Sequence, residues 1–222
     1  RPQVAAPALV NDHIVAITRS GTTTEVLRLL GSLPESQRST VITTSTELPV
    51  AAAARQTIAL DFADEESVVQ TRFATGALAL WRAHLGEDLT AASADAETEL
   101  ARDLPAGILE RSQITYLGTG WTVGLANEGG LMLRETAQFW AESYPAMEYR
   151  HGPISTAGPG AAVWFLDPPP EGLAAEVVAT GATAIEAAGD PLAELVRVQR
   201  LALAIAEARG LDPDNPPHLT RA

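Results

Sequence analysis

Hydroxyl side chains gather in one short segment of the chain. The segment consists of Thr18, Arg19, Ser20, Gly21, Thr22 and Thr23. It follows an apolar run, 13–17, and precedes a helix-like pattern. Backbone N–H groups at a helix N-terminus bind anions, and hydroxyls add donors at little steric cost. The segment therefore predicts a phosphate site that needs no lysine. The alternative is a plain helix cap, in which Thr22 and Glu25 form a capping box and the turn is merely polar.

Two carboxylates, Glu128 and Glu135, lie seven residues apart. That spacing puts them on roughly one face of a helix. Gly129 and Gly130 weaken such a helix, which indicates that something approaches its backbone closely. A pocket that raised the pKa of Glu135 would make it a general base. The alternative is a solvated carboxylate on the helix surface.

His151 precedes Gly152-Pro153 in a stiff loop. Its imidazole can shuttle a proton near neutral pH, although a loop histidine can also be structural or simply exposed. The other three histidines have no metal-ligand spacing with it, so we expect no metal site. The segment 118–120 reads Gly-Thr-Gly and lacks the third glycine of a dinucleotide fingerprint, so we expect no nucleotide redox cofactor.

Alternating strand and helix patterns position these residues. The expected strands cover 13–17, 40–44, 57–61, 114–117, 161–166 and 182–187. Helices are expected over 68–85, 173–178 and 191–209. Further helices are expected after Thr22, after Thr122 and from a start within 86–99, and a loop is expected over 142–153. This alternation favours an α/β fold with mostly parallel sheets. A repeat of strand, small-residue turn and helix divides the chain near 86–112 into two related units.

Composition removes several classes of function. The chain has 222 residues, no cysteine, no lysine and a formal net charge of −13. Disulfides, thiolate metal sites, a Schiff-base lysine and a Walker-type phosphate lysine are excluded. The acidic balance argues against a nucleic-acid partner, and no apolar run reaches the roughly 18 residues of a membrane span. The chain begins at Arg1 without a methionine or signal peptide, and we expect it to be a fragment or to lack its leading part.

Three blocks resemble motifs of the SIS (sugar isomerase) domain family. Residues 16–23, A-I-T-R-S-G-T-T, resemble the phosphate loop A-I-S-x-S-G-x-T. Residues 127–153 resemble the family block E-G-A-L-K-L-K-E…A-E-x-Y…E-x-x-H-G-P. Residues 214–221, D-N-P-P-H-L-T-R, resemble the tail D-x-P-R-N-L-A-K. Their order and spacing match over nearly the whole chain, in particular in the isomerase half of glucosamine-6-phosphate synthase and in phosphosugar deaminases and deglycases.

The resemblance implies two SIS subdomains, each a mostly parallel sheet flanked by helices in three α/β/α layers. It places the first subdomain at 1–90, without its first strand–helix unit, a connecting helix at 91–112, and the second subdomain with its tail at 113–222. It also implies a phosphorylated sugar as ligand, no cofactor, no membrane partner, a homodimer and a cytoplasmic location.

Carried over residue by residue, the resemblance assigns two sets of positions. The substrate-binding positions are Thr18, Arg19, Ser20 and Thr23 for the phosphate, Val68 and Gln70 for the sugar, and Arg221 in the tail. The catalytic positions are Glu135, which moves a proton between C1 and C2, and His151, which opens the sugar ring from the partner subunit.

The chain departs from the family pattern at several of these positions. Met132 replaces a lysine near Glu135, Arg221 replaces the tail lysine, and Thr18 and Gln70 replace serines. Loss of the lysine should raise the pKa of Glu135 relative to the family. The resemblance implies aldose–ketose isomerisation, with or without deamination, of a hexose phosphate or amino-sugar phosphate. The alternatives are a non-catalytic phosphosugar-binding regulator and a structural paralogue without activity.

Overall fold

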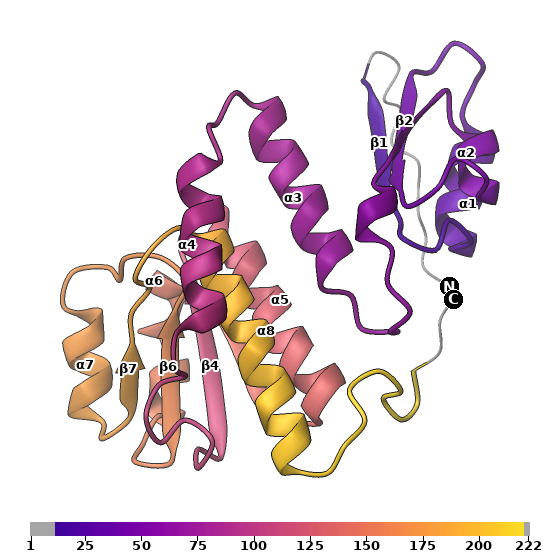
Figure 1. The fold of residues 1–222 in the computed structure, drawn as a ribbon. Helices are drawn as coiled ribbons and strands as arrows, with labels where there is room; N and C mark the ends of the chain where they lie inside the picture. The colour runs from indigo at the N-terminus through magenta and orange to yellow at the C-terminus, as the bar shows by residue number, and fades with distance from the viewer. Residues whose placement is uncertain (1–11, 220–222) are drawn as a thin grey trace. The chain divides into compact units, whose positions relative to one another are not determined.

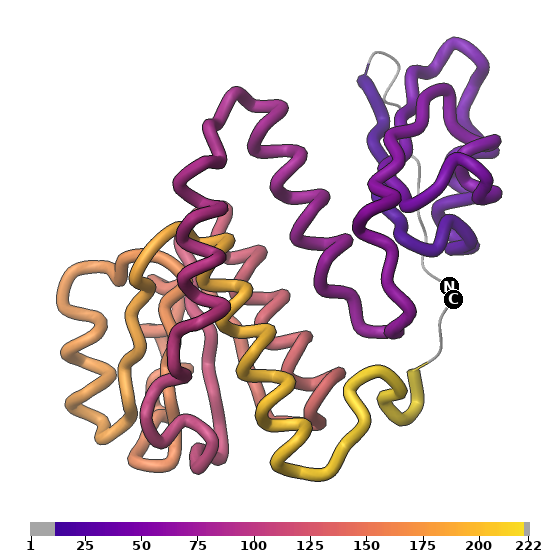
Figure 2. The backbone as a smooth tube through the Cα atoms, viewed as in Figure 1, coloured from indigo at the N-terminus to yellow at the C-terminus, as the bar shows by residue number. Residues whose placement is uncertain are grey.

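The computed structural model describes residues 12–219. These residues divide into two compact units, 12–85 with Leu219, and 86–218. Figure 1 labels the α-helices and most strands of the two units, and Figure 2 follows the chain through both. Each unit contains its own parallel sheet flanked by helices. The predicted α/β class with two parallel sheets is therefore confirmed.

The first unit is a three-stranded parallel sheet in the order β1-β2-β3. Its elements are β1 (Ile14–Ile17), α1 (Thr24–Ser32), β2 (Ser39–Thr43), α2 (Pro49–Ala53), β3 (Gln56–Ala59), the short 3-10 helix η1 (Asp61–Ala63) and α3 (Arg72–His84). Helices join successive parallel strands, so the carboxyl ends of all three strands lie at one edge of the sheet.

The two faces of this sheet are buried against different helices. Successive residues of a strand point to opposite faces, and both Val41 and Ile42 of β2 are almost fully buried. Val41 packs in a cluster with Leu30 of α1 and Val50 of α2. Ile42 packs in a cluster with Phe73 of α3. The sheet therefore lies between α1 and α2 on one side and α3 on the other.

The second unit is a four-stranded parallel sheet in the order β5-β4-β6-β7. Its elements are α4 (Thr90–Ala101), β4 (Gln113–Gly118), α5 (Thr122–Ala137), β5 (Ala141–Pro145), α6 (Ala146–Tyr149), the 3-10 helix η2 (Pro153–Thr156), β6 (Ala161–Phe165), α7 (Leu173–Ala179), β7 (Thr183–Ile185) and α8 (Pro191–Ala208). The chain winds from β4 to β5 on one side and then crosses to β6 on the other.

Alternation along β4 separates the layers of this unit. Leu117 packs in a cluster with Tyr149 of α6 and Val177 of α7. Its neighbour Tyr116 faces the opposite layer, where a Cβ built on Gly129 of α5 would lie 3.3 Å from the Tyr116 ring. The backbone of α5 therefore approaches β4 closely at Gly129, as a glycine inside a helix predicts. A larger residue there would crowd the Tyr116 ring.

Charged residues are buried between α4, α8 and β6. The Glu194 carboxylate, 1% exposed, accepts hydrogen bonds from Trp164 Nε1 at 2.6 Å and Arg197 Nη1 at 3.1 Å. Arg197 also lies 3.6 Å from the carboxylate of Glu99 on α4. These contacts pair opposite charges that would otherwise be costly to remove from water, although Arg197 Nε and Glu99 Oε2 make no hydrogen bond, and they tie α4 and α8 to the sheet.

Several element boundaries differ from the sequence prediction. The helix predicted over 68–85 begins only at Arg72, and the preceding residues 64–71 form a loop. The segment expected to be a loop, 142–153, contains most of β5 and all of α6. In the segment 91–112 the helix ends at Ala101, and an irregular stretch that contains Pro105 and Gly107 follows.

Candidate functional site

The turn between β1 and α1 is shaped by Gly21. This glycine has φ of +63°, and a Cβ built on it would lie 2.6 Å from Leu48 Cβ. Its carbonyl accepts a hydrogen bond from Val50 N at 3.1 Å, which anchors the turn on the start of α2. A glycine is therefore required here both for its backbone conformation and for the space it leaves.

Hydroxyls of the turn bond to one another. Thr18 Oγ1 and Thr23 Oγ1 lie 3.0 Å apart, and Ser20 Oγ accepts a hydrogen bond from the Thr22 hydroxyl at 3.1 Å. The residue before α1 is Thr23, and its side chain does not cap the helix. The capping box predicted from Thr22 and Glu25 is therefore wrong, because α1 begins at Thr24, two residues beyond Thr22.

Arg19 connects this turn to two distant segments. Its side chain is 4% exposed and donates a hydrogen bond from Nη1 to the Ser67 carbonyl at 2.5 Å. Its own carbonyl accepts from the hydroxyls of Thr43, at 3.3 Å, and Thr44, at 3.0 Å, where β2 ends. Arg19 therefore holds the loop before α3 against the β1–α1 turn.

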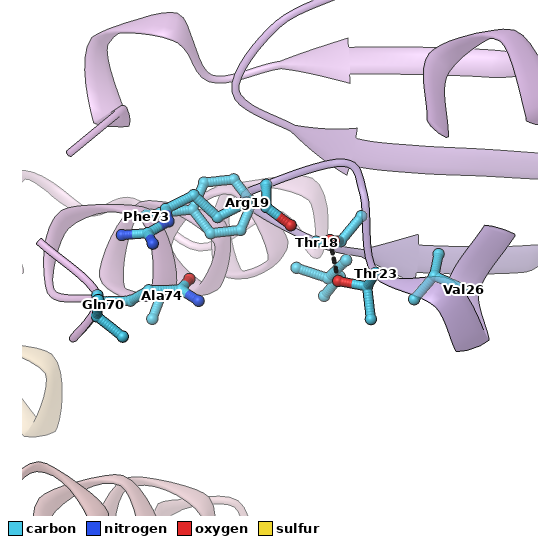
Figure 3. Close-up of a pocket in the computed structure, with 10 residues that line it drawn as sticks. Thr18, Arg19, Thr23, Val26, Gln70, Phe73 and Ala74 are labelled. Carbon is cyan, nitrogen blue, oxygen red and sulfur yellow. Dashed lines mark hydrogen bonds between the residues drawn. The ribbon is translucent and has the colours of Figure 1, made fainter. Parts of the chain in front are cut away.

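These contacts enclose a pocket of about 340 Å³ in the first unit. It is lined by Ile17, Thr18, Arg19, Ser20, Thr23, Val26, Val68, Gln70, Phe73 and Ala74. Figure 3 shows Thr23 just before α1 and Val26 on α1, with Gln70 in the loop before α3 and Phe73 and Ala74 in the first turn of α3. The pocket brings together all six residues that the resemblance assigns to the phosphate and the sugar within the described chain.

The chemistry of this lining suits a small anion with a polar body. Its lining residues include one cation, several hydroxyls and an amide, but no acidic side chain. The first-turn N–H groups of α1 receive no cap from Thr23, so they can donate to an anion. A small pocket of this kind can hold a phosphate at the β1–α1 turn although the whole chain is strongly acidic.

Sequence reasoning missed one residue that shapes this pocket. Glu65 is 8% exposed, and its carboxylate accepts hydrogen bonds from Thr71 N at 3.0 Å and Phe73 N at 3.1 Å, at the start of α3. A carboxylate seven residues before the first residue of a helix is not a cap signal that a local pattern can reveal. The signal available in the sequence is its place within an acidic loop that precedes the sugar-site positions.

The catalytic candidate Glu135 lies near the end of α5, in the second unit, with its side chain half-buried. Burial raises the pKa of Glu135, and the neighbouring Arg134 opposes the rise. Burial also raises the pKa of Glu128, with a further contribution from the charge of Glu135. The raised pKa of Glu135 was expected from the loss of a lysine at Met132, but its first cause is burial.

His151 lies in the turn after α6 and is exposed. Its backbone N–H donates to the Glu148 carbonyl at 3.0 Å, and Gly152 follows with φ of +135°. Within residues 12–219, no hydrogen bond or ion pair joins the side chains of His151 and Glu135. The roles assigned to both residues stay predictions.

Three further expectations concern the rest of the chain. Arg221, the tail residue expected to approach the sugar, lies outside the described residues. Across 12–219, no group of three or more histidine, aspartate or glutamate side chains is arranged to hold a metal ion. No helix in that same range has the length and apolarity to cross a membrane.

Comparisons with known proteins agree with the motifs, although no family model matches the chain. The chain is 31% identical over 162 residues to a glutamine–fructose-6-phosphate aminotransferase (isomerizing) of Pyrobaculum aerophilum, covering 60% of this chain and 27% of that protein. It is 32% identical over 164 residues to the enzyme of the same name from Sulfolobus acidocaldarius, covering 68% and 28%. The chain thus spans little more than a quarter of the length of these relatives.

A solved structure extends the match over most of the fold. Glucosamine-6-phosphate deaminase from Thermotoga maritima superimposes with a TM-score of 0.78 at 25% identity, covering 94% of this chain and 74% of that one. The sequence relatives and the structural relative thus agree in pointing to one family. The chain therefore belongs to the SIS (sugar isomerase) domain family of phosphosugar isomerases.

Proposed function

We propose that this chain binds a hexose phosphate or amino-sugar phosphate and isomerises it between aldose and ketose forms, with or without coupled deamination. The observation that carries the proposal is the pocket of about 340 Å³, which gathers Thr18, Arg19, Ser20 and Thr23 with Val68 and Gln70 from a loop some fifty residues away. That volume lies within the range of small-molecule sites. The names of the relatives, an isomerizing aminotransferase of fructose 6-phosphate and a deaminase of glucosamine 6-phosphate, support the same substrate class.

The phosphate is bound at the β1–α1 turn. Its hydrogen bonds come from backbone N–H groups of α1 and from the hydroxyls of Thr18, Ser20 and Thr23. Arg19 holds the turn in place through its hydrogen bond to the Ser67 carbonyl. The remote phosphate contributes positioning, because binding energy far from the reacting carbons holds the sugar in a reactive orientation.

Proton transfer is assigned to the second unit. His151 assists opening of the sugar ring by exchanging a proton with the ring oxygen and the C1 hydroxyl. Glu135 then removes the proton from one of the carbons C1 and C2 and returns it to the other, through an enediol or an enolamine. A pKa raised by burial suits Glu135 to this role, since a base whose pKa approaches the working pH also reprotonates its product.

We further propose a homodimer, in which His151 acts on the sugar bound by the partner subunit. Its exposed position in a turn supports this role, because a side chain that serves a neighbouring molecule must project from its own. A cytoplasmic location stays a prediction.

A non-catalytic phosphosugar-binding regulator is the second candidate. One observation favours it: every residue that lines the pocket belongs to the first unit, and Glu135 and His151 are not among them. The two candidates differ in turnover and agree on the ligand.

Thermal unfolding with a panel of ligands tests the proposal. The panel contains fructose 6-phosphate, glucosamine 6-phosphate, the two free sugars and inorganic phosphate. A ligand at about 100 times its dissociation constant raises the free energy of unfolding by about 2.7 kcal/mol. We expect stabilisation by a phosphosugar and not by its free sugar, followed by interconversion of the stabilising sugar. Stabilisation without turnover selects the regulator, and no response to any phosphosugar contradicts both candidates.

A further inference from the structure

We infer that Glu65 is a positioning residue that decides which way the phosphosugar lies in the pocket, an inference that rests on the proposed function. Two helices present their N-termini to this pocket, α1 through Thr23 and Val26, and α3 through Phe73 and Ala74. Glu65 occupies the N-terminus of α3 and so leaves only that of α1 to the ligand's phosphate.

The carboxylate of Glu65 accepts hydrogen bonds from most of the backbone N–H groups at the start of α3. Oε1 accepts from Thr71 N at 3.0 Å and Phe73 N at 3.1 Å. Oε2 accepts from the Thr71 hydroxyl at 2.8 Å and Arg72 N at 3.3 Å. The first N–H groups of a helix have no partner within the helix, and they are the groups that would otherwise bind an anion. In α3 the protein supplies that anion itself.

The start of α1 is arranged in the opposite way. Its flanking residue Thr23 does not cap the helix, because its hydroxyl bonds to Thr18 instead. The unused N–H groups and the helix dipole favour an anion at this end of the pocket. The carboxylate of Glu65 disfavours a second anion at the other end through like-charge repulsion. The phosphate therefore binds at α1, and the sugar extends toward the loop before α3.

Glu65 also sets where that loop lies. The residues between it and Thr71 form a closed loop, because the carboxylate at its beginning bonds to the backbone at its end. The loop carries Val68 and Gln70 into the pocket. Arg19 joins the same loop to the phosphate turn through the Ser67 carbonyl. The distance between the phosphate turn and the sugar-facing side chains thus depends on Glu65.

The first test needs no ligand. Amide hydrogen exchange is measured in the full chain carrying Glu65→Gln, which keeps the shape but turns an NH₂ group toward N–H donors. Glu66→Gln is the matched control, since Glu66 is the next residue, has the same charge and is exposed. We expect faster exchange at Thr71 and Phe73 in the first variant only, with α1 unchanged. Equal exchange in both variants would overturn the inference.

The second test is calorimetric titration with fructose 6-phosphate, glucosamine 6-phosphate and inorganic phosphate. Loss of the hydrogen bonds that hold the loop is expected to weaken phosphosugar binding by Glu65→Gln about tenfold. Inorganic phosphate, which needs only the α1 turn, should keep its affinity within about twofold. Glu66→Gln should match the wild type for all three ligands. Glu65→Asp, which keeps the charge, should recover part of the lost phosphosugar affinity.

Other outcomes separate the possible failures. Equal weakening of phosphosugars and inorganic phosphate would mean that Glu65 supports the fold alone, and overturns the inference. Tighter binding of every ligand by Glu65→Gln would mean that Glu65 acts only as a nearby negative charge, and also overturns it. A wild-type chain that binds none of the three ligands would contradict the proposed function, whereas the exchange experiment would still decide whether Glu65 holds the loop.

Discussion

The hydroxyls of Thr18 and Thr23 lie 3.0 Å apart across the β1–α1 turn. This single contact joins the end of a strand to the residue that precedes a helix. It holds two hydroxyls on the wall of the pocket and keeps the Thr23 side chain away from the backbone of α1. A side chain suited to cap the helix is thereby used to keep the helix N-terminus open for a ligand.

Replacing Thr23 by valine tests this arrangement. Valine keeps the branched shape and removes the hydroxyl, so both the bond to Thr18 and a donor to the phosphate are lost. We expect phosphosugar affinity to fall by about tenfold, as for the loss of one or two hydrogen bonds. Thr24→Val is the control, because Thr24 is exposed and does not line the pocket. Calorimetric titration measures both, and equal affinities in the two variants would contradict the assigned phosphate site.

Glu135→Gln should remove turnover and leave binding largely intact. Loss of a general base lowers kcat by roughly 10²- to 10⁴-fold. Phosphosugar affinity should stay within about tenfold, because the pocket lies in the other unit. Parallel kinetics and titration measure the two effects, and equal losses of kcat and affinity would rule out the assigned role.

The pH profile of the wild-type chain tests the same role of Glu135 as the general base. Only the carboxylate form of Glu135 can accept a proton, and burial raises its pKa above the ordinary value of 4.5. We therefore expect kcat/KM to fall as the pH drops through this raised pKa, so the acid limb lies above the range of an exposed glutamate. An acid limb at or below 4.5 would argue that another group is the base.

Mixing two inactive variants tests the proposed role of His151 across a dimer. If Glu135→Gln chains and His151→Asn chains exchange subunits, each mixed dimer regains one intact site. Random exchange in a two-fold dimer then restores about a quarter of the wild-type activity. The control is each variant unfolded and refolded alone. Activity that stays at the level of the controls would mean that both residues act within one chain, or that mixed dimers do not form, which light scattering and mass spectrometry of the mixture would show.

Arg197→Met should destabilise the second unit strongly. The change leaves the buried carboxylates of Glu194 and Glu99 without their shared cation. Removal of one partner from a buried ion pair costs about 3–5 kcal/mol of unfolding free energy. Glu176→Gln, which breaks the exposed pair with Arg150, should leave the urea midpoint nearly unchanged. Urea unfolding followed by circular dichroism compares them, and similar midpoints would contradict a structural role for the buried cluster.

Local patterns in the sequence were sufficient for the β1–α1 unit. A short apolar run followed by hydroxyls, a glycine and helical spacing predicts a strand, a turn and a helix with a possible anion site at their junction. The same reasoning identified β4 with α5 and the long helix α8, whose first residue is Pro191 and whose cap is Asp190. In these elements the determining interactions lie within a few residues of one another.

The tertiary structure decided which distant residues share the pocket. The start of α3 was predicted too early because its cap, Glu65, lies outside the helix and reaches it across a loop. The position of Val68 and Gln70 beside Thr18 depends on the pairing of parallel strands and on the bond from Arg19 to Ser67, some fifty residues away. The sequence by itself determined the elements and the chemistry they carry. Only the folded chain decided that the start of α1 is left open and that of α3 is filled, because that choice depends on how the turn and the loop fold: Thr23 bonds to Thr18, and Glu65 bonds to the backbone at the start of α3.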